Sequence, residues 1–372
     1  MRAADAGPLA GAQQPAAADA VEMPLLTLRR VLPSYAIGIV TTLAVALFAI
    51  CWGTVHIPPQ TTIAILLGHL PFVSTGTHDP TYDAIVWDVR VPRVVLAGLV
   101  GATLGYAGAT YQGVFRNPLA EPYLIGVAAG ASVGATLIII SPLYVAAGLL
   151  SPVPPAAFCG ALIAVALAYG LARAGRAVPV TGLILSGVAI SSIGTSVVTY
   201  LMLTYTDRTI SILNWTLGGF NTASWTKSAI ALPYMVVALV LILPFARLLN
   251  VMQLDDDDAR QLGVDVERVK LLLLGLASLA TAAAVAVSGL IGFVGLIVPH
   301  TARMIFGPDY RRVLPMSAFF GASFLILADT LARSLDGGRE IPIGVVTALI
   351  GAPFFLHLLR RYQRAAGELR DA

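Results

Sequence analysis

The chain has 372 residues, of which 57% are hydrophobic and only 12% are charged. Soluble globular proteins carry about 25% charged residues, so this composition and the mean hydropathy of +0.83 indicate a protein that lies in a lipid bilayer. The net charge of +3 is small and the basic residues are scattered, which excludes a nucleic-acid-binding surface. The two cysteines, Cys51 and Cys159, give neither a disulfide framework nor a metal-binding spacing.

The N-terminal segment, residues 1–30, is rich in Ala, Gly and Pro without apolar periodicity. It buries too little surface to offset the entropy of ordering, so we expect a disordered cytoplasmic tail. The first apolar run, Tyr35 to Trp52, follows two arginines and lacks a small-residue cleavage site. These features indicate a retained membrane span and not a signal peptide.

Runs of apolar residues long enough to cross a bilayer predict an all-α membrane protein with ten transmembrane helices. We expect a single ten-helix domain at 31–364, followed by a cytoplasmic C-terminal tail at 365–372. The predicted spans lie near 35–52, 94–114, 123–141, 156–172, 182–204, 229–249, 270–288, 290–306, 313–332 and 342–359.

An even number of spans puts both ends of the chain on one side of the membrane, and charge identifies that side. With the N-terminus in the cytoplasm, the inner segments hold 17 of the 23 Lys and Arg residues. An error of one span would invert every later loop, so this asymmetry supports the count of ten. The four tryptophans then fall at the outer interface, where amphipathic rings are favoured: Trp52, Trp87, Trp215 and Trp225.

Small residues predict close helix packing in two of the spans. Gly98, Gly101, Gly105 and Gly108 share one face of the second span, and Gly126, Gly130 and Gly134 form a GxxxGxxxG run in the third. Such rows let helix backbones approach closely in lipid. Two further apolar runs are too short to span and are expected to form interfacial or re-entrant helices: Thr62–Leu70 and Ile210–Phe220.

The source of energy separates the possible classes of membrane protein. A P-loop requires GxxxxGK[ST], and neither lysine, Lys227 or Lys270, follows a glycine, so the chain does not hydrolyse ATP in this way. An ion-coupled carrier needs carboxylates at mid-membrane, and the predicted spans carry almost none. The sequence contains no Ser-His-Asp, HExxH or paired-carboxylate pattern that would indicate an enzyme.

Two polar residues inside predicted spans have more than one interpretation. Asp329 precedes Arg333 by four residues, the helical spacing of an ion pair, and we expect a structural pair. His300 follows Pro299, which favours a hydrogen-bonded packing residue over a ligand or a proton carrier. The residues alone leave both alternatives open.

The loop 250–270 is the most unusual polar segment of the chain. Four consecutive aspartates, Asp255 to Asp258, favour a short helix that Gly263 ends, and a second short helix is expected near Val266. Two short helices across the cytoplasmic face would form a surface for a soluble partner. A merely solvated loop is the alternative.

Several long motifs resemble those of one family, the permease subunits of type II ABC importers, which take up cobalamin, haem and ferric siderophores. The resemblance covers about residues 34–360 and preserves the family's order of motifs. The motifs are RVPRVVLAGLVGATLGYAGATYQGVFRNPLAEPYLIGVAAGASVG (90–134), NWTLGGF (214–220), DDDDARQLGV (255–264), GLIGFVGLIVPHTARMIFGPDYRRVLP (289–315), ADTLARSL (328–335) and EIPIGVVTALIGAPFF (340–355).

The resemblance implies a homodimer or heterodimer of permeases in the bacterial cytoplasmic membrane, with two ATP-binding subunits and one substrate-binding protein. ATP and Mg would be used by the partner ATPase, and the permease would bind no cofactor or metal. Arg90 of the R-x-P-R motif and Arg333 of the A-D-x-x-A-R motif would face outward and pair with glutamates of the binding protein. Exposed guanidinium groups suit such docking because they bind carboxylates in a bidentate manner.

The resemblance also implies two cytoplasmic sites. The loop 250–270 matches the coupling helices that contact the ATPase, with Asp257, Ala259, Arg260, Leu262 and Gly263 as contact residues. The cytoplasmic gate would be formed by Asn117, Pro118 and Leu119 together with Val180 and Thr181 at the start of the fifth span. Val180 stands where the family has a hydroxyl residue, which weakens that part of the match.

The function predicted from the sequence is an importer permease for a haem, ferric siderophore or cobalamin, which is not itself an enzyme. An ion-coupled secondary transporter or an exporter of another class is the alternative, and it would need neither docking arginines nor a coupling loop. A channel is disfavoured because no segment resembles a selectivity filter or a ring of charges.

Overall fold

The computed structural model describes residues 28–53, 55–71, 73, 76, 79–146, 151–173, 179–335 and 340–368, and every regular element in these ranges is helical. The first helix, α1, begins at Leu28, and the last, α16, continues to Glu368. Most of the two predicted tails, residues 1–27 and 369–372, lies outside the described residues.

Seven helical segments in the described ranges are long and apolar enough to cross a membrane, and three shorter apolar helices complete a set of ten. The set confirms the predicted ten-helix fold. The long segments contain α1 (Leu28–Cys51), α4 (Val91–Phe115), α7 (Val153–Ala172), α8 (Val180–Thr204), α10 (Trp225–Ile242), α13 (Val266–Ser288) and α15 (Tyr310–Ala332). The shorter apolar helices are α5 (Val127–Ile139), α14 (Val294–Phe306) and the part Ile343–His357 of α16 (Ile343–Glu368).

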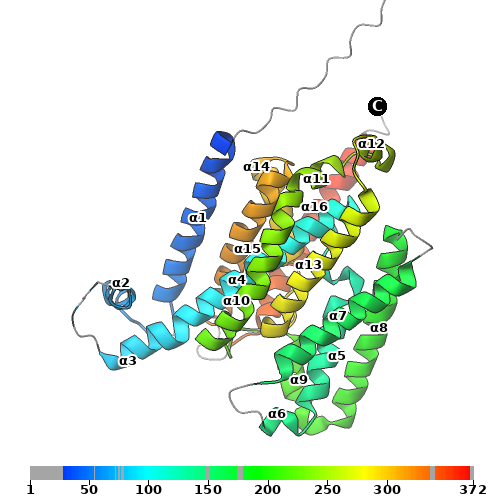
Figure 1. The fold of residues 1–372 in the computed structure, drawn as a ribbon. Helices are drawn as coiled ribbons and strands as arrows, with labels where there is room; N and C mark the ends of the chain where they lie inside the picture. Colours follow the sequence, from blue (N-terminus) through cyan, green and yellow to red (C-terminus); the bar gives the residue numbers. More distant parts are fainter. Residues whose placement is uncertain are drawn as a thin grey trace, which may run out of the picture.

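Short helices lie at both ends of the bundle (Figure 1). α2 (Pro59–Gly68), α3 (Pro80–Asp83), α6 (Leu143–Ala146) and α9 (Thr209–Thr216) lie at the lower end of that view. α11 (Ala246–Val251) and α12 (Asp256–Gln261) lie at the upper end. The predicted short helices at Thr62–Leu70 and Ile210–Phe220 correspond to α2 and α9.

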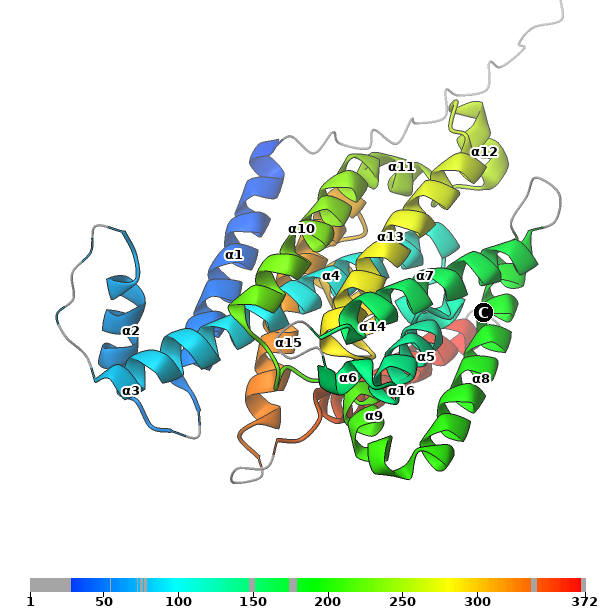
Figure 2. The same ribbon diagram turned by 60° about the horizontal axis from the view of Figure 1, so that its bottom comes forward.

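α4 runs through the centre of the bundle, where α13, α14 and α15 pack against it (Figure 2). A Cβ atom added to Gly101 would lie 2.2 Å from the carbonyl oxygen of Gly321 on α15, so glycine is required at this crossing. The pair of α5 and α7 uses the same device at Gly130, opposite Gly160. The predicted role of the glycine rows in close packing is therefore confirmed.

Two predicted spans are shorter than hydropathy suggests because irregular backbone precedes their helices. The span expected at 290–306 begins only at Val294, since Gly289 and Phe293 have positive φ angles of 70° and 68°. The span expected at 123–141 opens with a 3₁₀ turn, Pro122–Ile125, before α5. The second short helix expected near Val266 is instead the first turn of the continuous α13.

Candidate functional site

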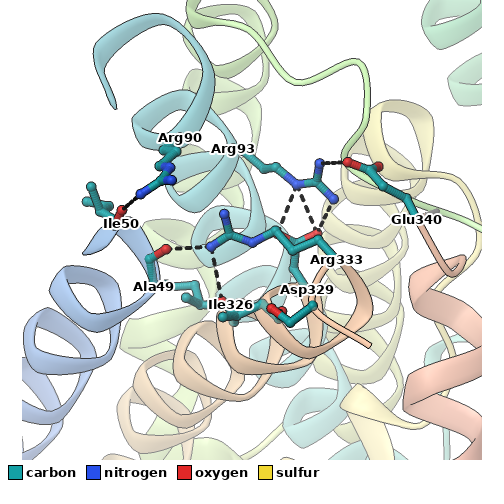
Figure 3. A network of polar contacts seen from close by, with 10 residues as sticks. Ala49, Ile50, Arg90, Arg93, Ile326, Asp329, Arg333 and Glu340 are labelled. Atoms are coloured by element: carbon teal, nitrogen blue, oxygen red, sulfur yellow. Dashed lines mark hydrogen bonds and ion pairs between the residues drawn. The ribbon is translucent and has the colours of Figure 1, made fainter. Parts of the chain in front are cut away.

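Five charged residues gather at the end of the bundle opposite α12 and form an arginine cluster: Arg90, Arg93, Asp329, Arg333 and Glu340 (Figure 3). Arg90 ends a π-helical turn, Ala84–Arg90, that leads directly into α4. Its Nη1 donates to the carbonyl oxygens of Ile50 at 2.8 Å and Cys51 at 3.4 Å, and its Nη2 donates to that of Val55. π-helical turns are rare and are frequently found at functional sites.

Arg333 lies beside Arg90 and contacts the same helix end. Its Nη2 donates to the carbonyl oxygen of Ala49 and, at 3.4 Å, to Thr330 Oγ1. The last carbonyls of a helix have no partner within the helix, so the two arginines cap the C-terminus of α1. Both are buried, with 4% of Arg90 and 9% of Arg333 exposed, which differs from the outward-facing arginines expected from the sequence.

The predicted ion pair of Asp329 with Arg333 is present at 3.9 Å, but Arg93 is the principal partner of Asp329. Nε and Nη2 of Arg93 approach the Asp329 carboxylate at 2.9–3.1 Å, and Nη1 donates to Glu340 at 2.7 Å. The Nε of Arg333 stays 3.9 Å from Asp329 and has no hydrogen-bond partner although it is buried. The bidentate geometry of Arg93 explains this preference, because it forms parallel charge-assisted hydrogen bonds.

At the other end of the bundle, α12 presents part of the predicted coupling site at its surface. Asp257 and Arg260 form an exposed ion pair at 3.2 Å, and Leu262 is 64% exposed. Gly263 follows the helix with φ of 81°, which suits a residue without a Cβ atom and ends the helix as predicted. Ala259 differs from the prediction because it is fully buried against the rest of the chain and offers no surface to a partner.

Asp256, next to the predicted contact residues, ties α12 to two membrane helices. Its Oδ1 accepts a hydrogen bond from Arg116 at the end of α4, and its Oδ2 lies 3.2 Å from Nζ of Lys270 in α13. Burial opposes ionisation of this carboxyl, but hydrogen bonds and positive charge from Lys270 and Arg116 outweigh it and hold the pKa of Asp256 below its ordinary value. Asp256 therefore remains ionised at neutral pH.

The predicted gate residues Asn117, Pro118 and Leu119 form a compact turn directly after Arg116. Oδ1 of Asn117 accepts a hydrogen bond from the backbone N–H of Leu119 at 2.9 Å. The backbone carbonyl of Asn117 accepts one from the backbone N–H of Ala120 at 3.1 Å. The other gate residues, Val180 and Thr181, begin α8. A pocket of about 340 Å³ brings Val180 together with the end of α4 and the coupling loop, and its lining includes Arg116, Asp256 and Lys270.

A second set of hydrogen bonds holds the other end of the gate segment. Glu121 Oε1 accepts from the backbone N–H of Phe293 at 2.8 Å. The hydroxyl of Tyr123 donates to the carbonyl of Ile291 at 3.0 Å and accepts from its N–H at 3.1 Å. A pocket of about 450 Å³ next to these residues is lined by Glu121, Tyr123, Leu124, Val188, Ser191, Ser192 and Thr195.

Sequence reasoning missed several residues of these sites for identifiable reasons. Arg93 lies three residues after Arg90, and this helical spacing could have predicted that both arginines lie on the same face of the helix. Asp256 cannot be distinguished from its three acidic neighbours without the structure, and nothing local links it to Arg116. His300 is buried and packs edge-on against Phe354, with ring centroids 6.1 Å apart, which agrees with the packing interpretation.

Comparisons with known proteins agree on one class of transporter. Residues 41–361 match the FecCD transport family. The chain is 46% identical over 280 residues to the cobalamin import system permease protein of Halobacterium salinarum, covering 75% of this chain and 74% of that protein. It is 40% identical over 303 residues to the hemin transport system permease protein of Yersinia pestis, covering 80% and 89%. A solved inward-facing structure, assigned to the metal-chelate type of ABC transporter, aligns with a TM-score of 0.74 at 30% identity, covering 89% of this chain and 99% of that one.

Proposed function

Since the chain belongs to the FecCD transport family of type II ABC importer permeases, we propose that it carries a metal chelate, delivered by a binding protein, into the cytoplasm. The chain is the multi-pass membrane subunit of such an importer, and ATP hydrolysis belongs to a separate subunit. The observation that carries the proposed substrate class is the similarity to permeases named for cobalamin and hemin, both of which are metal chelates. A haem, a ferric siderophore or a cobalamin is the expected cargo.

The two candidate sites suit two different partners. The proposed assembly contains two copies of this permease, or one copy and a related permease, with two ATPase subunits that use ATP and Mg. The ATPases would bind the surface formed by Asp257, Arg260, Leu262 and Gly263 on the cytoplasmic side of the inner membrane. One binding protein would dock at the arginine cluster, which lies at the opposite end of the bundle (Figure 1).

The proposed mechanism is alternating access. ATP binding draws the two ATPases together and moves the coupling loop, and the turn Asn117–Leu119 with Val180 and Thr181 then opens or closes the exit. The irregular backbone at 289–293 and the turn at 117–121 fit this mechanism, because such backbone is tolerated in a membrane where it lines a water-filled path.

A reconstituted complex tests the proposed function. The permease, its candidate ATPase and its candidate binding protein are incorporated into proteoliposomes, and ATP hydrolysis and uptake of haem, a ferric siderophore and cobalamin are measured separately. We expect the loaded binding protein to stimulate ATP hydrolysis and one cargo to accumulate. Uptake by the permease without its partners would contradict the proposal, as would failure to bind the ATPase.

The proposed docking role of Arg90 and Arg333 needs a test that separates it from capping of α1. In Arg90→Gln with Arg333→Gln, the side-chain amides can still donate to the α1 carbonyls but carry no charge. Charge reversal of both residues to Glu removes the positive charge and also the hydrogen-bond donors to the α1 carbonyls. We expect both double variants to lower binding-protein affinity by about tenfold or more, since the lost term is electrostatic.

A control for local charge is Arg208→Glu. Arg208 pairs with Asp207, lies outside the arginine cluster and directly precedes α9, a helix at the same end of the bundle. Affinity is measured by surface plasmon resonance on permease in nanodiscs, and the midpoint of thermal unfolding reports the loss of capping. Unchanged affinity in the Gln pair, with a lowered midpoint in the Glu pair, would leave capping as the only role of these arginines.

A further inference from the structure

We propose that Asp256 is the residue through which movement of the coupling loop reaches the cytoplasmic gate. This inference rests on the proposed function and adds a positioning residue to it. Asp256 does not touch cargo or nucleotide; it acts through Arg116, the residue that immediately precedes the gate turn.

The first observation is that the coupling loop holds the end of α4 directly. Arg116 donates through Nη2 to Asp256 and through Nε to the carbonyl of Met252. Gln253 Nε2 donates to the carbonyl of Gly113 at 3.1 Å. Three side-chain hydrogen bonds therefore join residues 252–256 to the last turn of α4, so the two segments move together.

The second observation is that Asp256 joins two membrane helices with its two oxygens. Oδ1 binds Arg116 at the end of α4, and Oδ2 binds Lys270 in the first turns of α13. Lys270 also lies 3.8 Å from Glu267, one turn earlier in α13, and only 13% of its side chain is exposed. Because a carboxylate with two charge-assisted partners resists displacement from either, Asp256 fixes α12 relative to both helices.

The third observation is that the chain between Arg116 and the gate is stiff. Arg116 has a left-handed backbone with φ of 49°, which is costly for a residue other than glycine and persists where surrounding contacts hold it. Asn117 closes the following turn by accepting from Leu119, and Pro118 has a fixed φ. A displacement of Arg116 is therefore transmitted to Leu119 and not absorbed in the backbone.

The fourth observation is that the far end of the gate segment is anchored separately. Glu121 and Tyr123 bind the backbone of Phe293 and Ile291, which belongs to the irregular segment before α14. The gate segment 116–125 is thus held by the coupling loop at one end and by this anchor at the other. Movement of the coupling loop would therefore turn Leu119 about the anchor. The pocket lined by Arg116, Asp256 and Val180 lies where this movement begins.

The chain offers a matched control next to Asp256. Asp255 is exposed and occupies the N-cap position of α12, where its side chain makes no capping hydrogen bond. Asp255→Asn and Asp256→Asn make the same chemical change on adjacent residues, and Asn also suits an N-cap. Only the second variant removes the charge that binds Arg116 and Lys270.

The experiment uses the full complex of permease, ATPase and binding protein in proteoliposomes. For Asp256→Asn we expect ATP hydrolysis within about twofold of the native complex and cargo uptake lowered by about tenfold, in line with the coupling energies carried by single residues. For Asp255→Asn we expect native values of both. Arg116→Gln should repeat the loss, and the double variant Asp256→Asn with Arg116→Gln should lose no more than either single variant.

A second readout follows the gate itself. In a chain with Cys51→Ala and Cys159→Ala, Leu119→Cys reports gate exposure through its rate of reaction with N-ethylmaleimide. We expect ATP with vanadate to change this rate in the native complex and to leave it unchanged in Asp256→Asn, although Asp256→Asn hydrolyses ATP when vanadate is absent. A merely structural role of Asp256 would lower assembly or hydrolysis and would not abolish the nucleotide response alone.

The results separate failure of this inference from failure of the proposed function. If the native complex transports and Asp256→Asn transports equally well with a normal nucleotide response, the role of Asp256 is refuted and the proposed function stands. Multiplicative losses in the double variant would also refute it, because they would show that Asp256 and Arg116 act independently. If the native complex neither assembles nor hydrolyses ATP, it is the proposed function that fails.

Discussion

Arg93 is the most heavily used side chain of the arginine cluster, since its guanidinium group binds two carboxylates at once. Only 3% of the Asp329 side chain and 11% of that of Arg93 are exposed. A buried ion pair costs desolvation of both partners, so its presence does not by itself stabilise a protein. Removal of one partner, however, leaves the other charge buried and uncompensated.

We therefore predict that Arg93→Met lowers the free energy of unfolding by about 3 kcal/mol, because Asp329 loses its main partner. The double variant Arg93→Met with Asp329→Leu should recover part of this loss, since the buried Asp329 carboxylate is removed with its main partner. The recovery is incomplete because Glu340 still loses Arg93 and Arg333 loses its nearest carboxylate. Thermal unfolding of the purified permease in detergent measures both effects. A double variant that is less stable than Arg93→Met would show that the cluster stabilises the fold as a network and not through this pair.

The crossing of α4 and α15 depends on the absence of side chains at Gly101 and Gly321. An added Cβ at Gly101 meets the backbone of Gly321, which cannot rotate away as a flexible side chain would. We predict that Gly101→Ala destabilises the permease by about 2 kcal/mol through overpacking. Gly275→Ala in α13 is the control, because nothing lies within 4 Å of its added Cβ. The unfolding midpoints of the two variants measure the difference, and equal midpoints would contradict the close crossing.

Hydropathy predicted where the helices lie because the free energy of transfer into lipid depends mainly on the type of each side chain. It missed the break at 289–293 because Leu290, Ile291 and Phe293 are equally apolar in helical and irregular backbone. That break depends on hydrogen bonds from Glu121 and Tyr123, and Glu121 precedes Phe293 by 172 residues. Local sequence has no signal for such a contact.

The same distinction applies to the candidate sites. Family resemblance identified Arg90 and Arg333 by their motifs. It did not predict that both guanidinium groups are buried, because their burial depends on the position of the C-terminus of α1 in the packed bundle. Arg93 and Asp329 are 236 residues apart, so their pairing is a property of the packed bundle. The short helix α12 was predictable from its run of aspartates and the glycine that follows it. The burial of Ala259 and the contacts of Asp256 with Arg116 and Lys270 were not predictable from the local sequence.

At the scale of the whole molecule, the two candidate sites lie at opposite ends of one bundle, and α4 connects them. Arg90 and Arg93 lie at the beginning of α4, and Arg116 lies at its end. α4 is almost entirely buried and packs tightly against α15. Both features favour a rigid connection between the arginine cluster and the gate turn, so docking at one end and nucleotide at the other would act on the same helix.

This arrangement requires that α12 face the cytoplasm and α2 face the opposite side. In a background with Cys51→Ala and Cys159→Ala, Leu262→Cys follows α12 and Leu70→Cys lies just after α2; the native leucines are 64% and 52% exposed. We predict that a membrane-impermeant maleimide labels Leu262→Cys in inverted vesicles only and Leu70→Cys in spheroplasts only, because the excess of Lys and Arg marks the α12 side as cytoplasmic. The reverse pattern would put the coupling loop outside the cell, where no ATPase could drive it, and would refute both the orientation and the proposed function.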